Sequence, residues 1–395
     1  MTEPTRRQSC LVVAHNYHPA VGAAAIRLQL LTSRLVDDQM AVTVLTSSTD
    51  QELTGPSGET VIGTSRGWMP SSRVFRTLVL AARGAAAARR HDVVISDPPP
   101  YVALAAMLGA RAAGATGVFY YCDSWASVAA SRPSRAWHAA GKVFGLLEAA
   151  AALTARVTAA STPALAQRAR SWSSRVELVR NGTDLSTYHP QGPAWEGQEL
   201  PKDYFLYAGT MGLVHGAEVF VNAAEQLWAE GKDVGLVFVG SGAESEVIRE
   251  AAQRSQGRIL FLDPLPPEQI ARLYRGCAGA LSSMRPVPGY EDARPVKTLA
   301  AMACGAIPVY VSGGELAGEL ADAGLGFVAP YSVAGARQTM EAVLRLSDAE
   351  RERLSAECRR HAEEHFDQRL AASQVARAIA EPPARHARRA GLGRR

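Results

Sequence analysis

The chain has 395 residues, 47% of them hydrophobic and 20% charged, which is the composition of a soluble globular protein and enough length for two domains. Its formal net charge of +4 is a small excess for this length, and much of it lies in the last stretch, ARHARRAGLGRR. These values do not indicate a nucleic-acid-binding protein.

The chain has five cysteines. They are odd in number and include no C-x-x-C pair, which disfavours a disulfide framework and a zinc site. The N-terminal stretch MTEPTRRQSCLVVAHNYHP contains only a short apolar run, and no run of about eighteen apolar residues occurs without a charge. We therefore expect a cytoplasmic protein with no signal peptide and no transmembrane helix.

Short apolar strands alternate with helical stretches through the first half of the chain. The predicted strands are 10–14 (CLVVA), 42–46 (VTVLT), 92–96 (DVVIS), 117–121 (GVFYY), 156–161 (RVTAAS) and 176–180 (VELVR). Uninterrupted apolar strands separated by helices are typical of a parallel sheet with helices on both faces. We therefore predict an α/β domain over residues 1–188.

The stretch HPQGPAWEGQELPK, residues 189–202, breaks this pattern and is interpreted as a linker. A second series of strands follows at 204–209, 234–240, 258–263, 279–284, 307–312 and 325–330. We predict a second doubly wound, Rossmann-like parallel-sheet domain over 203–365. Residues 366–380 are expected to form a C-terminal helix that crosses back to the first domain, and 381–395 a basic disordered tail.

Three glycine-containing loops follow predicted strands. They are 14–31 with Gly22 and Arg27, 207–220 with Gly209, Gly212 and Gly216, and 238–248 with Gly240 and Gly242. In such sheets ligands bind at the carboxyl ends of strands, where loop N–H groups and helix N-termini attract anions. A single glycine-containing loop after a strand is common in turns and indicates no function by itself. The prediction of an anion-binding site therefore rests on the occurrence of all three loops. The first loop lacks G-x-G-x-x-G, which argues against a dinucleotide site.

Several stretches match a known family in its own order over roughly residues 10–370. They are HPAVGAAAIRLQLLTSRL, DVVISDPPPYVALAAMLGAR, CDSW (122–125), VRNGTDLSTYHP, YAGTMGLVHG, FVGSG and RPVKTLAAMACGAIPV (294–309). With them the chain resembles the retaining glycosyltransferases of family 4, especially their bacterial surface-polysaccharide branch. The resemblance implies a GT-B fold, with two Rossmann-like domains facing across a cleft. It also implies sugar transfer from a nucleoside diphosphate, usually a uridine one, with retention at the anomeric carbon.

The resemblance places the nucleotide in the second domain and the acceptor in the first. The residues assigned to nucleotide binding are Gly22, Gly209, Thr210, Gly212, His215, Gly216, Gly240, Gly242, Asp263, Leu265, Asp292, Pro295, Val296 and Lys297. A departing diphosphate needs cations and oriented N–H groups. The candidate catalytic residues are Lys297, Arg294 and Asp123. The candidates on the acceptor side are His15, His18, Arg27 and Trp125.

Each assignment has a structural alternative. Lys297 is otherwise a solvated lysine at a helix start, Arg27 a partner in a surface salt bridge, and Asp123 a cap at a strand end. His215 either touches a phosphate or only lines its loop. The two histidines of the first loop are otherwise ordinary surface residues.

Two segments depart from the family pattern. In patterns such as P-S-K-x-x-E-x-M-A the family places a glutamate that hydrogen-bonds the ribose; here that position is Ala300, and the acids nearest before it are Glu291 and Asp292. The segment that reads D-x-R-D-x-W in the family branch reads YYCDSW here, so its first acid and its arginine are missing. A non-catalytic or partner-dependent relative therefore stays open as an alternative to an active enzyme.

The chain contains no D-x-D motif, which favours a metal-independent enzyme without a cofactor. Residues 66–90 contain six arginines and no acid, with an apolar face from Val74 to Leu80. Such a basic amphipathic segment favours contact with an anionic membrane, although a helix packed on a sheet gives the same pattern. The donor sugar, a hexose or an N-acetylhexosamine, stays open, as does the acceptor, either a lipid-linked glycan or a natural product.

Overall fold

The structure, a computed structural model, describes residues 7–20, 23–64, 72–130, 132, 134–287, 290 and 293–381. The chain divides into two compact units. Unit 1 contains the described residues up to Ala126, the stretch Ala139–Val179 and the chain from Ala372 onwards; unit 2 contains Ser127–His138 and Arg180–Ala371. Gly22, Glu291, Asp292, residues 66–71 and most of the basic tail lie outside the described residues.

Unit 1 is built on an eight-stranded sheet in the order β3-β4-β2-β1-β5-β6-β7-β8. The strands are β1 (Ser9–Ala14), β2 (Ala41–Thr46), β3 (Glu52–Thr54), β4 (Thr60–Gly63), β5 (Val93–Ser96), β6 (Thr116–Tyr121), β7 (Val157–Ala160) and β8 (Val176–Leu178). Neighbouring strands are parallel except for the β3–β4 pair, which is antiparallel. The central strands are buried because helices cover both faces of the sheet.

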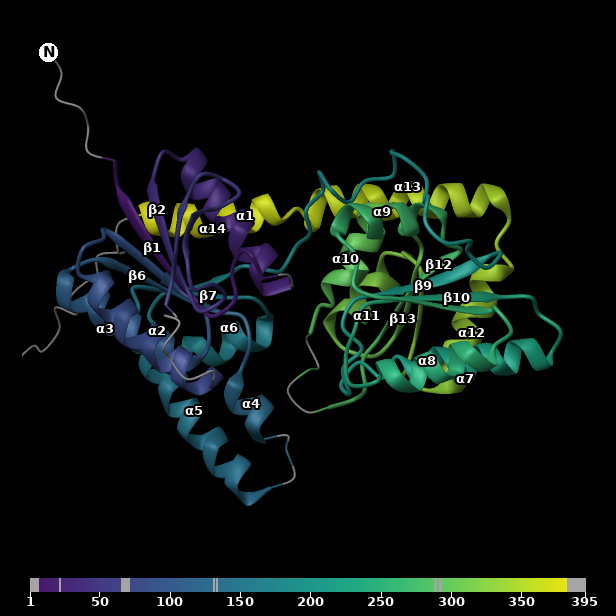
Figure 1. Ribbon diagram of the computed structural model, residues 1–395, viewed down its shortest axis with the longest axis horizontal. Coiled ribbons are helices and arrows are strands. Elements are labelled where there is room, and N and C mark those ends of the chain that lie inside the picture. The colour runs from purple at the N-terminus through teal and green to yellow at the C-terminus, as the bar shows by residue number, and fades with distance from the viewer. Residues whose placement is uncertain are drawn as a thin grey trace, which may run out of the picture. The chain divides into compact units, whose positions relative to one another are not determined.

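The helices of this part of the chain are α1 (Ala23–Asp37), α2 (Arg73–Ala88), α3 (Pro100–Ala113), α4 (Trp125–Ala130), α5 (Arg135–Thr154), α6 (Pro163–Arg170) and α14 (Gln368–Ala380). Figure 1 shows α1 and α14 above the sheet of unit 1 and α2 and α3 below it. Leu80 of α2 and Met107 of α3 pack with Leu11 of β1 and Phe119 of β6 in one hydrophobic core. Packing against the sheet therefore explains part of the apolar face of α2.

Unit 2 is built on a six-stranded parallel sheet in the order β11-β10-β9-β12-β13-β14. The strands are β9 (Tyr204–Ala208), β10 (Gly235–Val239), β11 (Ile259–Leu262), β12 (Gly279–Ser283), β13 (Pro308–Val311) and β14 (Phe327–Ala329). In chain order this is the doubly wound arrangement 3-2-1-4-5-6, in which ligands bind where the order reverses. The reversal lies between β9 and β12 in unit 2 and between β1 and β5 in unit 1.

The helices of unit 2 are α7 (Glu218–Ala229), α8 (Ser245–Arg254), α9 (Pro267–Gly276), α10 (Val296–Ala303), α11 (Glu315–Asp322), α12 (Val333–Leu344) and α13 (Asp348–His365). Figure 1 shows α9, α10 and α13 on one side of this sheet and α7, α8 and α12 on the other. The stretch expected as a linker packs on unit 2, because Trp195 and Leu200 contact its core and Arg275 donates to the carbonyls of His189 and Pro193.

Candidate functional site

Lys297 lies in the first turn of α10, after the N-cap residue Pro295 and after Val296. Its Nζ donates to the Tyr207 hydroxyl at 2.5 Å and to the Thr210 carbonyl at 3.3 Å, and lies 3.9 Å from the centre of the Tyr207 ring. The side chain as a whole is half-buried, but its ammonium end is pressed against this ring, and burial lowers the pKa of Lys297 to about 7. The amine thus lies at the carboxyl end of β9 and is partly deprotonated near pH 7. A bound anion would raise its pKa and favour the protonated, positively charged form.

Two glycine loops meet beside this lysine. Gly209, with φ of 135°, directly follows β9, and a Cβ there would lie 3.3 Å from Lys297 Cε. A Cβ on Gly240 would lie 2.2 Å from the Gly209 carbonyl oxygen, and one on Gly242 would lie 2.4 Å from that of Met211. Backbones that approach this closely require glycine. The glycines after β9 and β10 therefore bring two backbone loops together at the reversal point of the sheet.

The loop from Gly212 to Gly216 places His215 near Lys297. The His215 N–H donates to the Gly212 carbonyl at 2.8 Å, and the half-buried ring has a buried Nδ1 without a hydrogen-bond partner among the described residues. Burial, and next the charge of Lys297, lower the pKa of His215 to about 4. The imidazole is therefore neutral at pH 7 and can donate or accept one hydrogen bond at each nitrogen.

A cluster behind this loop fixes its shape. Arg285 donates to Glu244 at 2.9 Å and to the Tyr331 hydroxyl at 3.2 Å. Glu244 accepts from the Ala217 N–H at 2.8 Å, and Tyr331 donates to the Gly216 carbonyl at 3.0 Å. The sequence assignments missed this cluster, although Glu244 directly follows the stretch FVGSGA, residues 238–243. It holds the loop at the start of α7 in one conformation.

Arg294 forms ion pairs with two carboxylates of α11. Its side chain is buried, and Nη1 lies 2.6 Å from Glu319 and 3.6 Å from Glu315, both on α11. The guanidinium also lies over the Phe366 ring at 5.3 Å. Its charge is thus compensated by two carboxylates. The catalytic role assigned to Arg294 stays a prediction, and its contacts favour a structural role.

Two of the remaining nucleotide-side assignments have other contacts in the structure. Asp263 has an exposed side chain that is ion-paired with Arg249 at 2.5 Å. Leu265 packs against the hydrophobic core formed by β9, β10 and α9. Gly22 and Asp292 fall outside the described residues, so the structure gives no position for them.

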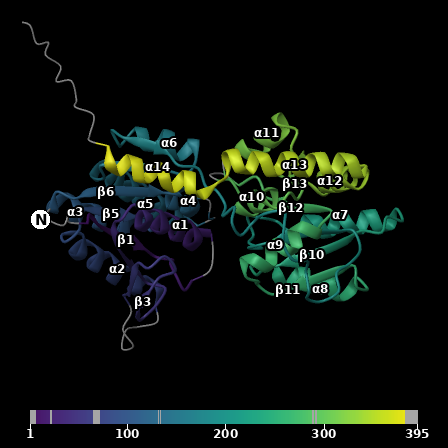
Figure 2. The same ribbon diagram turned by 90° about the horizontal axis from the view of Figure 1, so that it is seen from above.

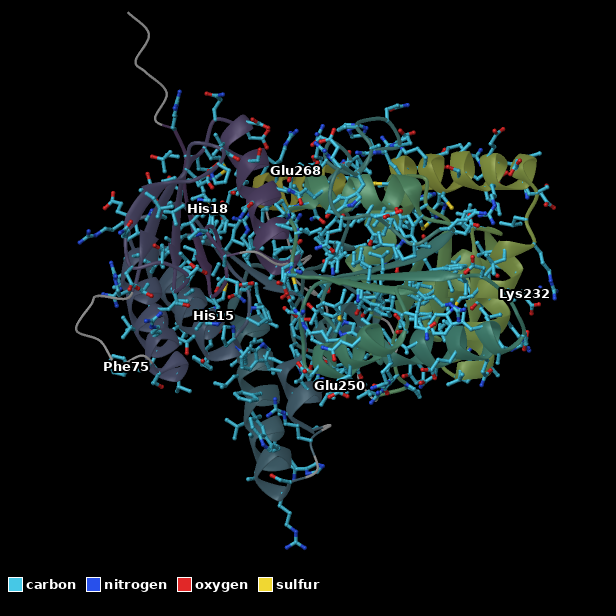
Figure 3. All side chains as sticks on the ribbon, turned by 45° about the vertical axis from the view of Figure 1, so that its right-hand side comes forward. His15, His18, Phe75, Lys232, Glu250 and Glu268 are labelled. Carbon is cyan, nitrogen blue, oxygen red and sulfur yellow. The ribbon has the colours of Figure 1, made fainter. Side chains whose placement is uncertain are left out.

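The two histidines assigned to the acceptor side differ in their surroundings. His15 follows β1, and its Nδ1 is hydrogen-bonded to the Ser47 hydroxyl at 2.7 Å. Its carbonyl oxygen accepts from the hydroxyls of Ser47 and Ser48. His18 is half-buried, and Figure 3 shows the two histidines apart rather than converging on one point. Of the two, His15 has the fixed orientation that a binding residue needs.

Arg27, Asp97 and Asp123 form a charged cluster in unit 1. Arg27, on α1, has its guanidinium 5.4 Å from the centre of the Tyr120 ring, and no ion pair of Arg27 occurs among the described residues. Burial raises the pKa of Asp97 to about 7, with Arg27 opposing and Asp123 adding to the rise. The alternative interpretation of Arg27 as a partner in a surface salt bridge is therefore not supported by its contacts. The sequence assignments missed Asp97, because only the fold shows that it is buried.

The segment that carries Asp123 and Trp125 is held by a buried carboxylate, Glu148 of α5. Glu148 accepts from the Tyr121 hydroxyl at 2.7 Å and from the Ala126 N–H at 3.0 Å. Trp125 packs edge-on against Phe144 of the same helix, with ring centres 5.7 Å apart. Asp123 itself is exposed. The sequence assignments missed Glu148, which lies far along the chain from the loop it organises.

No group of three or more His, Cys, Asp or Glu side chains within the described part of the chain could hold a metal ion.

Comparisons with known proteins bear on both units. Residues 202–348 match the family model described as glycosyl transferases group 1. The fold is similar to sucrose-phosphate synthase (tll1590) from Thermosynechococcus elongatus, with a TM-score of 0.74 and 18% identity over 94% of this chain and 98% of that one. No curated protein sequence matches the chain.

Two further solved structures have the same fold. Anabaena Alr3699/HepE, in a complex with UDP and glucose, gives a TM-score of 0.67 and 17% identity over 94% of this chain and 99% of that one. WaaG, a glycosyltransferase involved in lipopolysaccharide biosynthesis, gives a TM-score of 0.66 and 14% identity over 95% of this chain and 100% of that one. The predicted fold class is therefore confirmed. The chain has the GT-B fold of these structures, and its residues 202–348 match the glycosyl transferases group 1 model.

Proposed function

We propose that the protein is a retaining glycosyltransferase that moves a sugar from a nucleoside-diphosphate sugar, with uridine as the base, to a hydroxyl acceptor. The observation that carries the proposal is the Lys297 amine, buried against the Tyr207 ring beside Gly209, at the reversal point of the sheet in the matched domain. Support also comes from the solved HepE structures, which contain UDP and glucose or UDP-glucose. In this proposal unit 2 binds the donor and unit 1 binds the acceptor.

The chemistry requires stabilisation of a departing diphosphate. The bond between the anomeric carbon and the diphosphate oxygen breaks, a bond to the acceptor oxygen forms, and the acceptor's hydroxyl proton passes to the diphosphate. Lys297 supplies a positive charge, and the loop from Gly212 to Gly216 supplies N–H groups, with neutral His215 as a further donor. We leave Arg294 out of this step because Glu315 and Glu319 already compensate its charge. The proposed reaction uses no metal ion.

On the acceptor side we propose roles for the segment from Asp123 to Trp125, for His15 after β1, and for Arg27 and Asp97 of the charged cluster. Glu148 gives that segment a fixed conformation. The donor sugar is proposed to be a hexose or an N-acetylhexosamine, and the acceptor a lipid-linked glycan or a natural product.

A non-catalytic or partner-dependent relative is the second candidate, and Ala300 is the observation that favours it. Ala300 is buried in the core of unit 2, where it offers no hydrogen bond to a ribose. Glu315, the first acid after this helix, is already ion-paired with Arg180 at 2.7 Å and with Arg294. This candidate predicts that nucleotides bind weakly or not at all.

A thermal-shift screen separates the two candidates. A ligand at 100 times its dissociation constant stabilises the folded state by about 2.7 kcal/mol, so UDP at millimolar concentration should raise the unfolding temperature of the wild type by several degrees. ADP and GDP test the choice of base. Lys297→Ala should lose the shift, and Lys232→Ala, which removes an exposed lysine of the same unit (Figure 3), should keep it. The absence of a shift with every nucleotide would support the non-catalytic relative.

A peripheral membrane contact is proposed for α2. Leu80 faces the core, but Val74 and Leu78 are 66% and 54% exposed, and Figure 3 shows Phe75 at the outer surface of unit 1. None of the described helices is long and apolar enough to cross a bilayer. The exposed apolar positions therefore suit a helix that lies on a membrane rather than one that spans it.

The neighbouring helix extends this surface, since α2 and α3 lie side by side in both views (Figures 1 and 2). An open groove of about 680 Å³ between them is lined by Ala82, Ala85, Ala86, Arg89, Arg90, Ala105, Leu108 and Gly109. Neither helix contains an acidic residue. Apolar side chains beside two exposed arginines match the surface of an anionic bilayer, on which a lipid-linked acceptor would be presented.

A further inference from the structure

Arg27 and Asp97 are buried side chains of opposite charge that do not form an ion pair with each other. They are 8% and 5% exposed. Nε of Arg27 and Oδ1 of Asp97 are both buried and have no hydrogen-bond partner among the described residues. A buried polar group without a partner costs about 1–3 kcal/mol, and more when it is charged. Two such atoms in one charged cluster indicate a ligand group that satisfies both.

The cluster lies where a doubly wound sheet binds ligands. Arg27 is on the helix that follows β1, and Asp97 directly follows β5, the strand beside β1 at which the strand order reverses. The Tyr120 ring, at the end of β6, lies against the Arg27 guanidinium. The two orphaned atoms therefore come from neighbouring elements at the one edge of this sheet that is arranged for binding.

The chemistry of this edge disfavours a phosphate. Pro98, Pro99 and Pro100 directly follow Asp97, and the last two are the N-cap and the first residue of α3; proline has no N–H, so this helix start offers fewer of the donors that bind anions elsewhere. Two carboxyl groups, Asp97 and Asp123, stand against one guanidinium. An ammonium group is disfavoured as well, because it cannot accept a hydrogen bond from Arg27.

We propose that Arg27 and Asp97 form a subsite for a hydroxyl group of a neutral sugar. One hydroxyl completes both partners, because its oxygen accepts from the Arg27 Nε–H and its proton is donated to Asp97 Oδ1. The subsite rests on the proposed function in that the sugar is the acceptor of the transfer. It names the chemical class of that acceptor at this position as an uncharged polyhydroxyl compound.

The subsite also predicts a direction of pH dependence. Burial raises the pKa of Asp97 to about 7, opposed by Arg27 and by N–H donors that include His15, and reinforced by Asp123. Burial also raises the pKa of Cys122 to about 12, so this thiol stays neutral. Ionised Asp97 accepts a hydrogen bond from the sugar hydroxyl more strongly than the protonated acid does, so binding should strengthen as the pH rises from 6 to 8.

Saturation-transfer NMR on the full chain tests the subsite without turnover. The probes are neutral methyl glycosides of glucose, galactose and mannose, cationic glucosamine and anionic glucose 6-phosphate. The wild type should bind at least one neutral glycoside, more tightly at pH 8 than at pH 6. Asp97→Ala and Arg27→Met should each weaken that binding at least tenfold, and Asp97→Asn should remove its pH dependence. Arg34→Met and Asp37→Asn change exposed residues of the same helix, α1, and should bind as the wild type does.

UDP binding by calorimetry on the same samples separates this subsite from the proposed function. If UDP binds but no neutral glycoside does, or if glucose 6-phosphate or glucosamine is the preferred probe, the subsite is overturned. It is also overturned if the glycoside binds equally well to Asp97→Asn, Asp97→Ala and the wild type. If glycosides bind as expected but UDP does not, the subsite stands and the donor side of the proposed function fails. Retained UDP binding in the variants shows that they are folded.

Discussion

Uridine diphosphate should bind with a proton taken up near neutral pH. The ammonium of Lys297 is buried against the Tyr207 ring, which lowers its pKa to about 7, so about half of the free protein carries a neutral amine at pH 7. A bound diphosphate brings negative charge beside the amine and favours its protonated form. Affinity for UDP should therefore fall as the pH rises above 7.

The size of the effect follows from the population of the protonated form. When only this form binds, the apparent dissociation constant is the intrinsic one divided by the protonated fraction. That fraction falls from about one half at pH 7 to about one hundredth at pH 9, so the dissociation constant rises about 50-fold, or ~2.3 kcal/mol. His215 does not add to this change, because its pKa is lowered to about 4. A terminal phosphate is already ionised, with a second pKa of about 6.

Calorimetric titrations of UDP between pH 6.5 and 9, in buffers of different ionisation enthalpy, give both the affinity and the number of protons taken up. Lys297→Arg keeps a charge that does not titrate and should bind with no pH dependence above pH 7. Lys297→Met should bind weakly throughout. Lys232→Met, the matched exposed lysine, should follow the wild type. An affinity unchanged between pH 7 and 9 in the wild type, or equally dependent on pH in Lys297→Arg, would refute the reasoning.

Four further predictions follow from individual features. Excess chelator should leave sugar transfer unchanged, and a loss restored by magnesium or manganese would contradict the proposed chemistry. Ala300→Glu should weaken UDP binding in calorimetry, because it places a carboxylate at a buried position in the core; tighter binding would show a vacant ribose pocket. Glu148→Gln should lower the free energy of unfolding by about 1–3 kcal/mol, measured with denaturant, since the buried N–H and hydroxyl donors lose a charged acceptor; unchanged stability would speak against its role. The wild type should co-sediment with phosphatidylglycerol vesicles but not with phosphatidylcholine ones, and Leu78→Glu should weaken this; an equal loss in Val247→Glu, which alters an exposed position of α8, would count against α2.

The sheets were predictable because buried parallel strands are continuous apolar runs. The stretches CLVVA and YFLYAG each coincide with a strand, β1 and β9. The β3–β4 hairpin was missed because Glu52–Thr54 is short, partly exposed and polar at both ends, with no run that distinguishes it from a loop. Local pattern thus predicts the buried centre of a sheet better than its edge.

The site was predictable only where its residues share one local motif. The glycines after β9 could be assigned because they directly follow a strand of a doubly wound sheet, and Lys297 because it lies at a helix start in a segment that matches the family. The pairing of Arg294 with Glu319 joins the segment before α10 to α11 and leaves no local signal. Asp97 lay within a stretch used for the family resemblance, but its burial and its unpaired Oδ1 appear only in the folded unit.

The most direct test of the central claim is the release of nucleoside diphosphate from a panel of nucleotide sugars that includes UDP-glucose and UDP-N-acetylglucosamine. The proposed function predicts that the wild type and Lys232→Ala release UDP from at least one donor, slowly with water as acceptor, and that Lys297→Ala releases none although it is folded. Release by Lys297→Ala at the wild-type rate, or no release from any donor by a wild type that also shows no thermal shift with UDP, would contradict it.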